Sequence, residues 1–263
     1  MCNWEFKVKK PIFFLVSILL LVPGLLFAEQ KYKEFLEDVD ALVSFPDTDL
    51  SAEYLIEKRD PGGAMSTTLA VMFRRDRTEQ FLILILEPLI DKGKGYLKQG
   101  NTIWLYDPED RTFTFTSAQD RFQNSSVRNS DFGKSNYAVD YKVTGSRKEK
   151  LGKFDTTVFD LEATNNRVSF PKVRIWISEE KLVRKIEDYS LSGQLMRTTA
   201  IPTYQKIGDR WIPRTMVIQD QLRSKKIGDR TEYERTTVTI SKPSLKSLPD
   251  SVYTKEYLER VAQ

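Results

Sequence analysis

Histidine is missing from all 263 residues of this sequence, and Cys2 is its only cysteine. Without histidine the chain lacks the most common general base, the Ser–His and Cys–His catalytic pairs, and the imidazole ligands of most zinc sites. A single cysteine cannot form an intrachain disulfide, and a chain of this length can bury a sufficient core without one. These absences leave paired carboxylates as the main route to hydrolytic chemistry.

The sequence also has no strong excess of either charge. Its 41 lysines and arginines against 37 aspartates and glutamates give a net charge of +4. An excess this weak does not indicate a nucleic-acid partner. Hydrophobic residues make up 40% of the chain and charged residues 30%, which is typical of a globular protein. A single all-β domain can reach this length.

Only one long apolar run is present, Ile12–Phe27, and three lysines between positions 7 and 10 precede it. A basic segment followed by a short apolar one is the pattern of a secretory signal. The run is shorter than the roughly 20 apolar residues of a membrane-spanning helix. We therefore expect residues 1–28 to be a signal peptide cleaved near Ala28, followed by one exported domain, 29–263. An uncleaved segment that anchors the domain to the inner membrane is the alternative.

Strand signals dominate the chain from Ser51 to Ser241. The helical spacing of apolar residues predicts one clear helix at Glu29–Phe45, and a short second helix follows at Val252–Val261. Two short helices cannot cover the apolar faces of about ten strands, so the sheet must curl on itself. We expect a mainly β fold with few helices, in which a strongly curved antiparallel sheet forms an incomplete barrel around the N-terminal helix.

Two features between the strands carry further expectations. The polar, weakly periodic segment Ser117–Asn136 is predicted to be a long loop, and such loops often act as lids or binding loops. The pentapeptide Lys-Ile-Gly-Asp-Arg occurs at 206–210 and again at 226–230. A repeat of ancestral origin is one interpretation, but Gly-Asp suits the turn between antiparallel strands, and we favour two hairpin turns.

Aromatic and aliphatic side chains give the best candidate for a site. In Thr112–Thr116 the two phenylalanines share one face, opposite three threonines. The helix offers one narrow stripe against the inner faces of many strands, so space should remain for apolar ligand atoms, although ordinary core packing is the alternative for any single residue. The candidate cavity residues are Phe35, Leu84, Trp104, Tyr106, Phe113, Phe115, Phe159, Leu161, Ile175, Ile177, Met216 and Ile218.

Other candidates for chemistry are weaker. The acidic residues around Pro108 and the pair Glu179-Glu180 have the composition of turns, and Gly93-Lys94-Gly95 lacks the remaining glycines of a phosphate-binding loop. The arginines of the segment 74–77 could meet a phosphate or a lipid head group, but an exposed hairpin tip is the simpler interpretation. We expect no catalytic residue, no metal and no cofactor, and therefore no enzyme.

Three motifs resemble one known family. Lys92–Leu97 leads through a glycine-rich turn to Asn101–Pro108, which contains Trp104 and Tyr106; Asn129–Phe132 contains Ser-Asp-Phe; and Ile207–Arg214 contains Gly-Asp-Arg-Trp-Ile-Pro. In this order and spacing they resemble the outer-membrane lipoprotein-sorting proteins of the LolA/LolB-like superfamily, in its broad uncharacterised branch. The resemblance covers the whole expected domain.

This resemblance implies a LolA-like incomplete barrel with helices in its opening and an apolar cavity that shields acyl chains in the periplasm. The implied function is a periplasmic carrier for the acyl chains of a lipoprotein or lipid, with an inner-membrane lipoprotein-releasing or lipid-exporting transporter as a partner and no nucleic acid. The alternative is a non-catalytic scaffold or accessory subunit of an envelope transporter complex. The arginine that gates acyl release in the dedicated carrier has no assigned counterpart in this sequence.

Overall fold

The computed structural model describes Met1 and residues 23–262. Its three α-helices are α1 (Pro23–Leu42), α2 (Tyr137–Asp140) and α3 (Lys255–Val261). Five short 3-10 segments are η1 (Asp76–Thr78), η2 (Leu89–Asp91), η3 (Phe122–Asn124), η4 (Asn129–Phe132) and η5 (Asp250–Tyr253). Most of the expected signal peptide lies outside the described residues. Among the described helices, none combines the length and the apolar character needed to cross a membrane.

Thirteen strands form one antiparallel sheet in the order β6-β5-β4-β3-β2-β1-β13-β12-β11-β10-β9-β8-β7. Their bounds are β1 (Leu50–Arg59), β2 (Met65–Arg75), β3 (Gln80–Glu87), β4 (Gly95–Gln99), β5 (Thr102–Asp107), β6 (Thr112–Thr116), β7 (Tyr141–Leu151), β8 (Phe154–Ala163), β9 (Lys172–Ser178), β10 (Val183–Tyr189), β11 (Leu195–Ile207), β12 (Arg210–Ile227) and β13 (Arg230–Ser244). Within the described chain β6 and β7 are the two free edges, so the barrel is incomplete and the expected fold class is confirmed.

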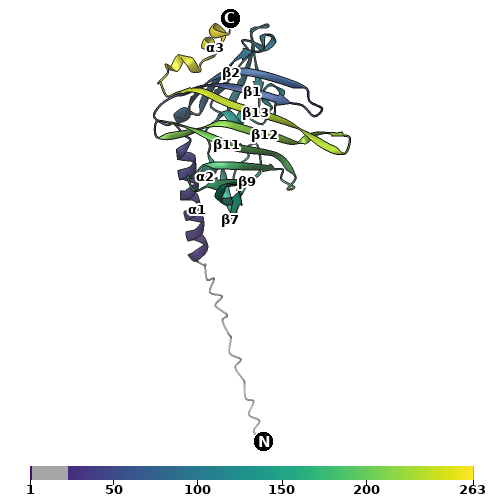
Figure 1. Ribbon diagram of the computed structural model, residues 1–263. Coiled ribbons are helices and arrows are strands. Elements are labelled where there is room, and N and C mark those ends of the chain that lie inside the picture. The colour runs from purple at the N-terminus through teal and green to yellow at the C-terminus, as the bar shows by residue number, and fades with distance from the viewer. Residues whose placement is uncertain (2–22, 263) are drawn as a thin grey trace.

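Strands that follow one another in sequence pair with each other, except β6 and β7 at the two edges, and β1 pairs with β13 in the middle of the sheet. Both copies of the repeated pentapeptide lie at hairpin turns, between β11 and β12 and between β12 and β13, which confirms that interpretation. The sheet is strongly curved. Phe81 of β3 and Val173 of β9 lie near opposite ends of the sheet order, and they can line one cavity only because the sheet bends. We call the face that bears this cavity the inner face; Figure 1 shows α1 and α2 lying beside the sheet.

The inner face is filled from two sides. The segment 117–136 contains η3 and η4 and places Phe122 and Phe132, both almost fully buried, in a cluster with Tyr54 and Phe81. At the other end of the sheet, Leu36 of α1 packs into a second cluster formed by β8, β9 and their neighbours. The expected loop is therefore a packed part of the core, and α1 covers only one end of the sheet.

Strand β3 is apolar from Phe81 to Leu86, and both of its faces are covered. Phe81 points to the inner face, whereas Leu82 points to the outer face, where α3 packs through the fully buried Leu258. This approach depends on Gly95, since a Cβ atom there would lie 2.4 Å from Leu258 Cδ1. Helix α3 thus gives the protein a third hydrophobic cluster on its outer face.

This outer cluster corrects part of the expected cavity. Alternation along a strand shows which residues share a face, but it does not show which face becomes concave. The candidates that instead contribute to the outer cluster beneath α3 are Leu84, Trp104, Tyr106 and Phe113.

Candidate functional site

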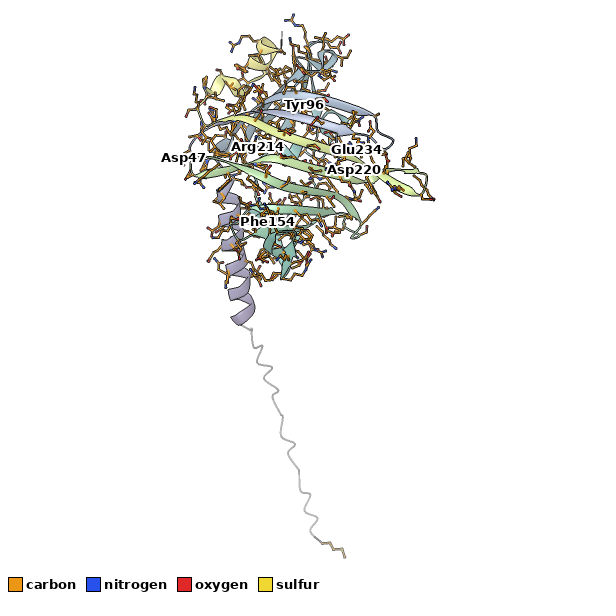
Figure 2. The ribbon with its side chains drawn as sticks, viewed as in Figure 1. Asp47, Tyr96, Phe154, Arg214, Asp220 and Glu234 are labelled. Atoms are coloured by element: carbon orange, nitrogen blue, oxygen red, sulfur yellow. The ribbon has the colours of Figure 1, made fainter. Side chains whose placement is uncertain are left out.

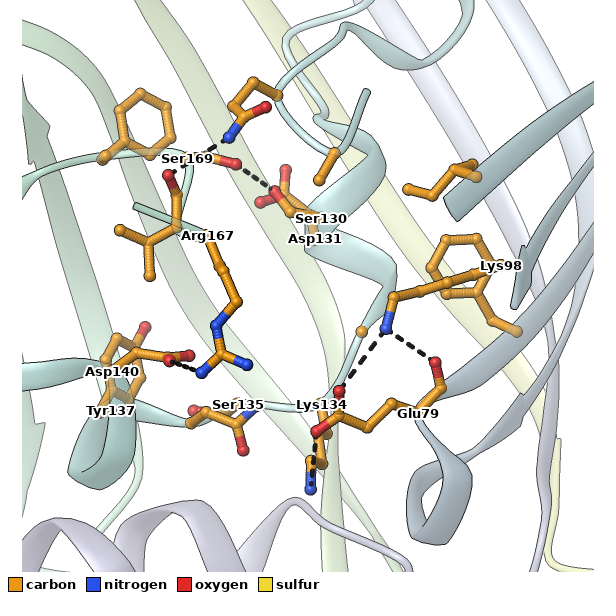
Figure 3. Close-up of a pocket in the computed structure, with 18 of the residues that line it drawn as sticks. Glu79, Lys98, Ser130, Asp131, Lys134, Ser135, Tyr137, Asp140, Arg167 and Ser169 are labelled. Carbon is orange, nitrogen blue, oxygen red and sulfur yellow. Dashed lines mark hydrogen bonds and ion pairs between the residues drawn. The ribbon is translucent and has the colours of Figure 1, made fainter. Parts of the chain in front are cut away.

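A cavity of about 730 Å³ opens between the inner face of the sheet, the segment 117–141 and the loop before β9. Figure 3 shows its polar side, where residues from these three parts of the chain converge. The volume lies within the range of small-molecule pockets, which is about 300–1,000 Å³. The curved sheet therefore encloses enough space for part of an amphiphilic molecule.

The floor of the cavity is apolar. It is formed by inward-facing side chains of β3, β5, β11 and β12, namely Phe81, Ile103, Ile201, Met216 and Ile218. All except Met216 are nearly or fully buried. Because these residues alternate with outward-facing ones, each strand contributes one or two side chains to the floor. Such a surface offers hydrocarbon atoms an environment that excludes water.

A buried ion pair stands beside this floor. Arg197 of β11 donates from Nε to Asp188 Oδ2 at 2.7 Å and from Nη1 to Asp131 Oδ2 at 2.6 Å. Burial alone disfavours the guanidinium cation, but the two carboxylates more than compensate and raise the pKa of Arg197. Arg197 also stacks over the Phe170 ring at 4.8 Å. The cation joins η4 to β10 and β11.

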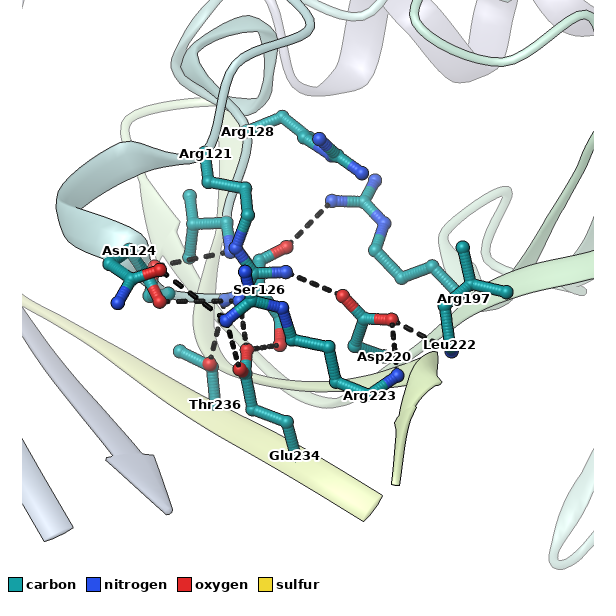
Figure 4. Close-up of polar contacts among 12 residues, drawn as sticks. Arg121, Asn124, Ser126, Arg128, Arg197, Asp220, Leu222, Arg223, Glu234 and Thr236 are labelled. Atoms are coloured by element: carbon teal, nitrogen blue, oxygen red, sulfur yellow. Dashed lines mark hydrogen bonds and ion pairs between the residues drawn. The ribbon is translucent and has the colours of Figure 1, made fainter. Parts of the chain in front are cut away.

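Further buried charges hold the segment 117–136 against the sheet. Asp220 of β12 and Glu234 of β13 are direct partners on adjacent strands, as Figure 2 shows. Arg121 donates to both carboxylates, and Ser126 Oγ donates to Glu234 Oε1 at 2.7 Å (Figure 4). Glu234 has no exposed surface, so its charge is stabilised by these neighbours and by Arg223, which lies 3.4 Å from Oε2. The segment is tied to the sheet by ion pairs as well as by aromatic packing, and we regard it as a wall of the cavity.

Helix α1 meets the same wall through one carboxylate. Asp40 accepts hydrogen bonds from Ser135 Oγ and from the Ala138 amide, at 2.5 Å and 3.0 Å. Burial raises the pKa of Asp40, although these hydrogen bonds oppose the shift. The contact fixes the end of α1 next to α2.

The mouth of the cavity carries three cations. Lys98 of β4, Lys134 and Arg167 line it together with two carboxylates, Glu79 and Asp140 (Figure 3). Lys98 donates to the Glu79 carbonyl oxygen at 2.8 Å and lies 3.8 Å from its carboxylate. Lys134 lies 3.5 Å from the other carboxylate oxygen of Glu79, and Arg167 lies 3.5 Å from Asp140. Polar and apolar surfaces therefore occupy different parts of one cavity.

Three of the twelve candidates from the sequence line this cavity: Phe115, Met216 and Ile218. Phe115 is 68% exposed and borders the cavity from the edge strand β6. Five lie at the other end of the sheet, in or against the cluster that α1 covers, namely Phe35, Phe159, Leu161, Ile175 and Ile177. Phe35 and Ile177 also border a second, smaller hollow of about 560 Å³. The remaining four lie beneath α3 on the outer face.

The arginines at the end of β2 are not free to meet a phosphate. Arg74 is paired with Asp76, and Arg75 is paired with Asp49 and stacks over the Tyr253 ring at 4.5 Å. Among the residues that the structure describes, no three His, Cys, Asp or Glu side chains gather as metal ligands would. The pair of Arg75 with Asp49 instead connects two segments of the chain that are not adjacent in sequence.

Sequence reasoning missed the polar groups of the cavity. Arg197, Asp188 and Lys98 are charged residues within predicted strands, and in the sequence each looks like an ordinary outward-facing residue. The available signal was that Arg197, Thr199 and Ile201 share a face with one another by strict alternation. When apolar and charged residues share one face of a strand, one part of that face is apolar and another part is polar.

Several solved structures share this fold. A LolA superfamily protein from Nitrosomonas europaea is 24% identical, with a TM-score of 0.71 and coverage of 86% of this chain and 98% of that chain. A domain from Vibrio parahaemolyticus described as an outer membrane lipoprotein-sorting protein is 19% identical, with a TM-score of 0.76 and coverage of 88% and 100%. A DUF1329 family protein from Desulfovibrio piger is 16% identical, also with a TM-score of 0.76, and coverage of 88% and 98%. These likenesses confirm the LolA-like fold that the motifs indicated.

Two sequence comparisons complete the picture. A family model described as that of an uncharacterised protein matches residues 77–260. No curated protein matches the sequence.

Proposed function

We propose that this chain, which belongs to the family of uncharacterised proteins whose model matches residues 77–260, is a carrier for lipid or lipoprotein acyl chains. Its LolA-like fold supports this proposal. The observation that carries the proposal is the cavity of about 730 Å³ with a floor of aromatic and aliphatic side chains. The carrier acts by burying hydrocarbon and then handing it over, and it needs no catalytic residue.

The energetics favour this use of the cavity. Each methylene group withdrawn from water contributes about 0.8 kcal/mol, so an acyl chain of about a dozen carbons contributes roughly 10 kcal/mol. Part of this is lost to the ordering of the ligand and of the cavity walls, which leaves an affinity in about the micromolar range. A carrier must bind in this range, because tighter binding would prevent release to the receiving membrane.

The location follows from the sequence pattern. We propose that residues 1–28 direct export and are removed near Ala28, and that the domain 29–263 works in the periplasm between the envelope membranes. A partner that delivers or receives the cargo belongs to the same proposal, and an inner-membrane lipoprotein-releasing or lipid-exporting transporter fits this role.

Binding to purified, delipidated protein tests the proposal. A fluorescent fatty acid is expected to bind with roughly micromolar affinity and to raise the melting temperature at saturation. Met216→Trp, which fills the floor of the cavity, is expected to weaken binding at least tenfold. Met65→Trp is the matched control, because Met65 is 61% exposed at the start of β2. Absence of binding by fatty acids, phospholipids and acylated peptides alike would rule out a carrier. Pull-down of a protein partner without lipid would instead favour the scaffold alternative.

A further inference from the structure

We propose that the cargo is an amphiphile with a monoanionic head group, which Lys98, Lys134 and Arg167 hold at the mouth while its hydrocarbon lies on the apolar floor. This inference rests on the proposed carrier function and adds to it the chemical class and the orientation of the cargo. The shared chemistry is one negative charge on a hydrocarbon chain, as in a free fatty acid or a phosphodiester lipid.

The balance of charges at the mouth is the first argument. Lys98 and Lys134 share the single carboxylate of Glu79, and Arg167 pairs with Asp140. Three cations thus face two carboxylates, and the three ion-pair distances, between 3.5 and 3.8 Å, are long for such contacts. One additional anion would balance the charges of the mouth.

The environment of Lys98 is the second argument. Burial lowers its pKa, Glu79 opposes this effect, and the nearby charges of Lys134 and Arg167 lower the pKa further. Lys98 is therefore repelled by both of the other cations of the mouth. An anionic head group among them would remove this repulsion, and it would reach a lysine that is already partly withdrawn from water.

The arrangement of apolar groups sets the orientation. Lys98 is the direct cross-strand partner of Phe81, so the cation lies at the edge of the apolar floor. Val139, an apolar residue that lines the cavity, remains 66% exposed. An exposed apolar group beside the cationic mouth suits the passage of a hydrocarbon chain whose charged end stays outside.

The deeper charges do not compete for the head group. Arg197 is surrounded by Asp188 and Asp131, and Arg74 is paired with Asp76. A second anion beside Arg197 would meet two carboxylates, which would repel it. The head group is consequently placed at the mouth rather than in the interior.

Competition against a bound fluorescent fatty acid tests the proposal with palmitate and hexadecanol, which have the same chain but differ in charge. We expect palmitate to bind about tenfold more tightly than hexadecanol, the effect of one hydrogen-bonded charge. Lys98→Met is expected to remove this preference, and Lys98→Arg to retain it. Lys225→Met is the matched control, since Lys225 is exposed near the tip of the β12–β13 hairpin. Melting temperatures of the variants without ligand show whether each remains folded.

The outcomes separate this proposal from the carrier function. Equal affinities for palmitate and hexadecanol, unchanged in Lys98→Met, would overturn the anionic head group and leave the carrier function intact. Binding of neither compound would count against the carrier function itself. A final arm compares palmitate with phosphatidylglycerol in mixed micelles. Preference for one of them, lost in Lys98→Met, identifies the anion as a carboxylate or a phosphodiester.

Discussion

Replacement of Arg197 by methionine is the strongest test of how the cavity is held together. Arg197 makes ion pairs with Asp188 and Asp131, donates a further hydrogen bond from Nη1 to the Ser126 carbonyl oxygen at 3.3 Å, and stacks over Phe170. Its side chain is only 9% exposed. Methionine preserves much of the volume but leaves the Asp188 carboxylate buried without its cation. Removing one partner of a buried ion pair costs about 3–5 kcal/mol.

We therefore expect Arg197→Met to lower the free energy of unfolding by about 4 kcal/mol, and the melting temperature by about 10 °C. Urea denaturation followed by tryptophan fluorescence measures the first quantity. Arg147→Met is the matched control, because Arg147 pairs with Asp160 and Glu149 on β7 and β8 but its side chain is 41% exposed. Loss of an exposed pair is expected to cost less than about 1 kcal/mol.

A second variant distinguishes lost pairing from lost packing. Arg197→Met combined with Asp188→Leu removes both charges, and it is expected to recover at least half of the stability that the single variant loses. If Arg197→Met is no more destabilised than Arg147→Met, or if the double variant is less stable than the single one, the ion pair does not hold the cavity together as described.

Three further variants test other parts of the structure. Gly95→Ala is expected to destabilise the protein by about 2 kcal/mol, because the new Cβ would meet Leu258 of α3, and urea denaturation measures this loss. Thr199→Val is expected to stabilise it by about 1 kcal/mol in the same assay, because the Thr199 hydroxyl is buried in the cavity wall without a hydrogen-bond partner. Asp49→Asn tests a pH dependence: burial favours the neutral acid, but hydrogen bonds from Arg75 and Leu248 lower the pKa of Asp49 below 3.8. Its carboxylate therefore stabilises the fold above pH 3.8, and the stability gap between wild type and Asp49→Asn is expected to narrow as the pH falls below 3.8.

Each of these variants has a control on the same protein. Gly133→Ala introduces a Cβ whose nearest neighbour is 3.4 Å away, and it is expected to have a small effect. Thr203→Val removes an exposed hydroxyl from the same strand as Thr199. Asp209→Asn removes a carboxylate that is 86% exposed, and it should leave the pH profile unchanged. Contrary results would be a stable Gly95→Ala, a destabilised Thr199→Val, or a gap for Asp49→Asn that does not change with pH.

Much of the fold could be predicted from the sequence because its signals are local. Alternation and turn residues located most of the strands, and Gly-Asp predicted both hairpin turns around β12. The continuous apolar run Phe81–Leu86 is typical of a strand covered on both faces, and the structure covers both faces of β3. The helix was predicted at Glu29–Phe45 and lies at Pro23–Leu42. The two ranges differ at the helix ends, because the spacing of apolar residues does not define where a helix begins or ends.

The order of amino acids was enough to establish that this chain is rich in strands, that few helices cover them, and that no histidine is available for chemistry. Which face of the sheet is concave depends on the packing of the folded chain, which places Trp104 beneath α3 while Met216 lines the cavity. It alone brought Lys98 and Arg167 together at the mouth and buried Glu234 beneath Arg121. The reason is physical: the two-residue period of a strand assigns side chains to two equivalent faces. Contacts between residues far apart in sequence then decide what covers each face.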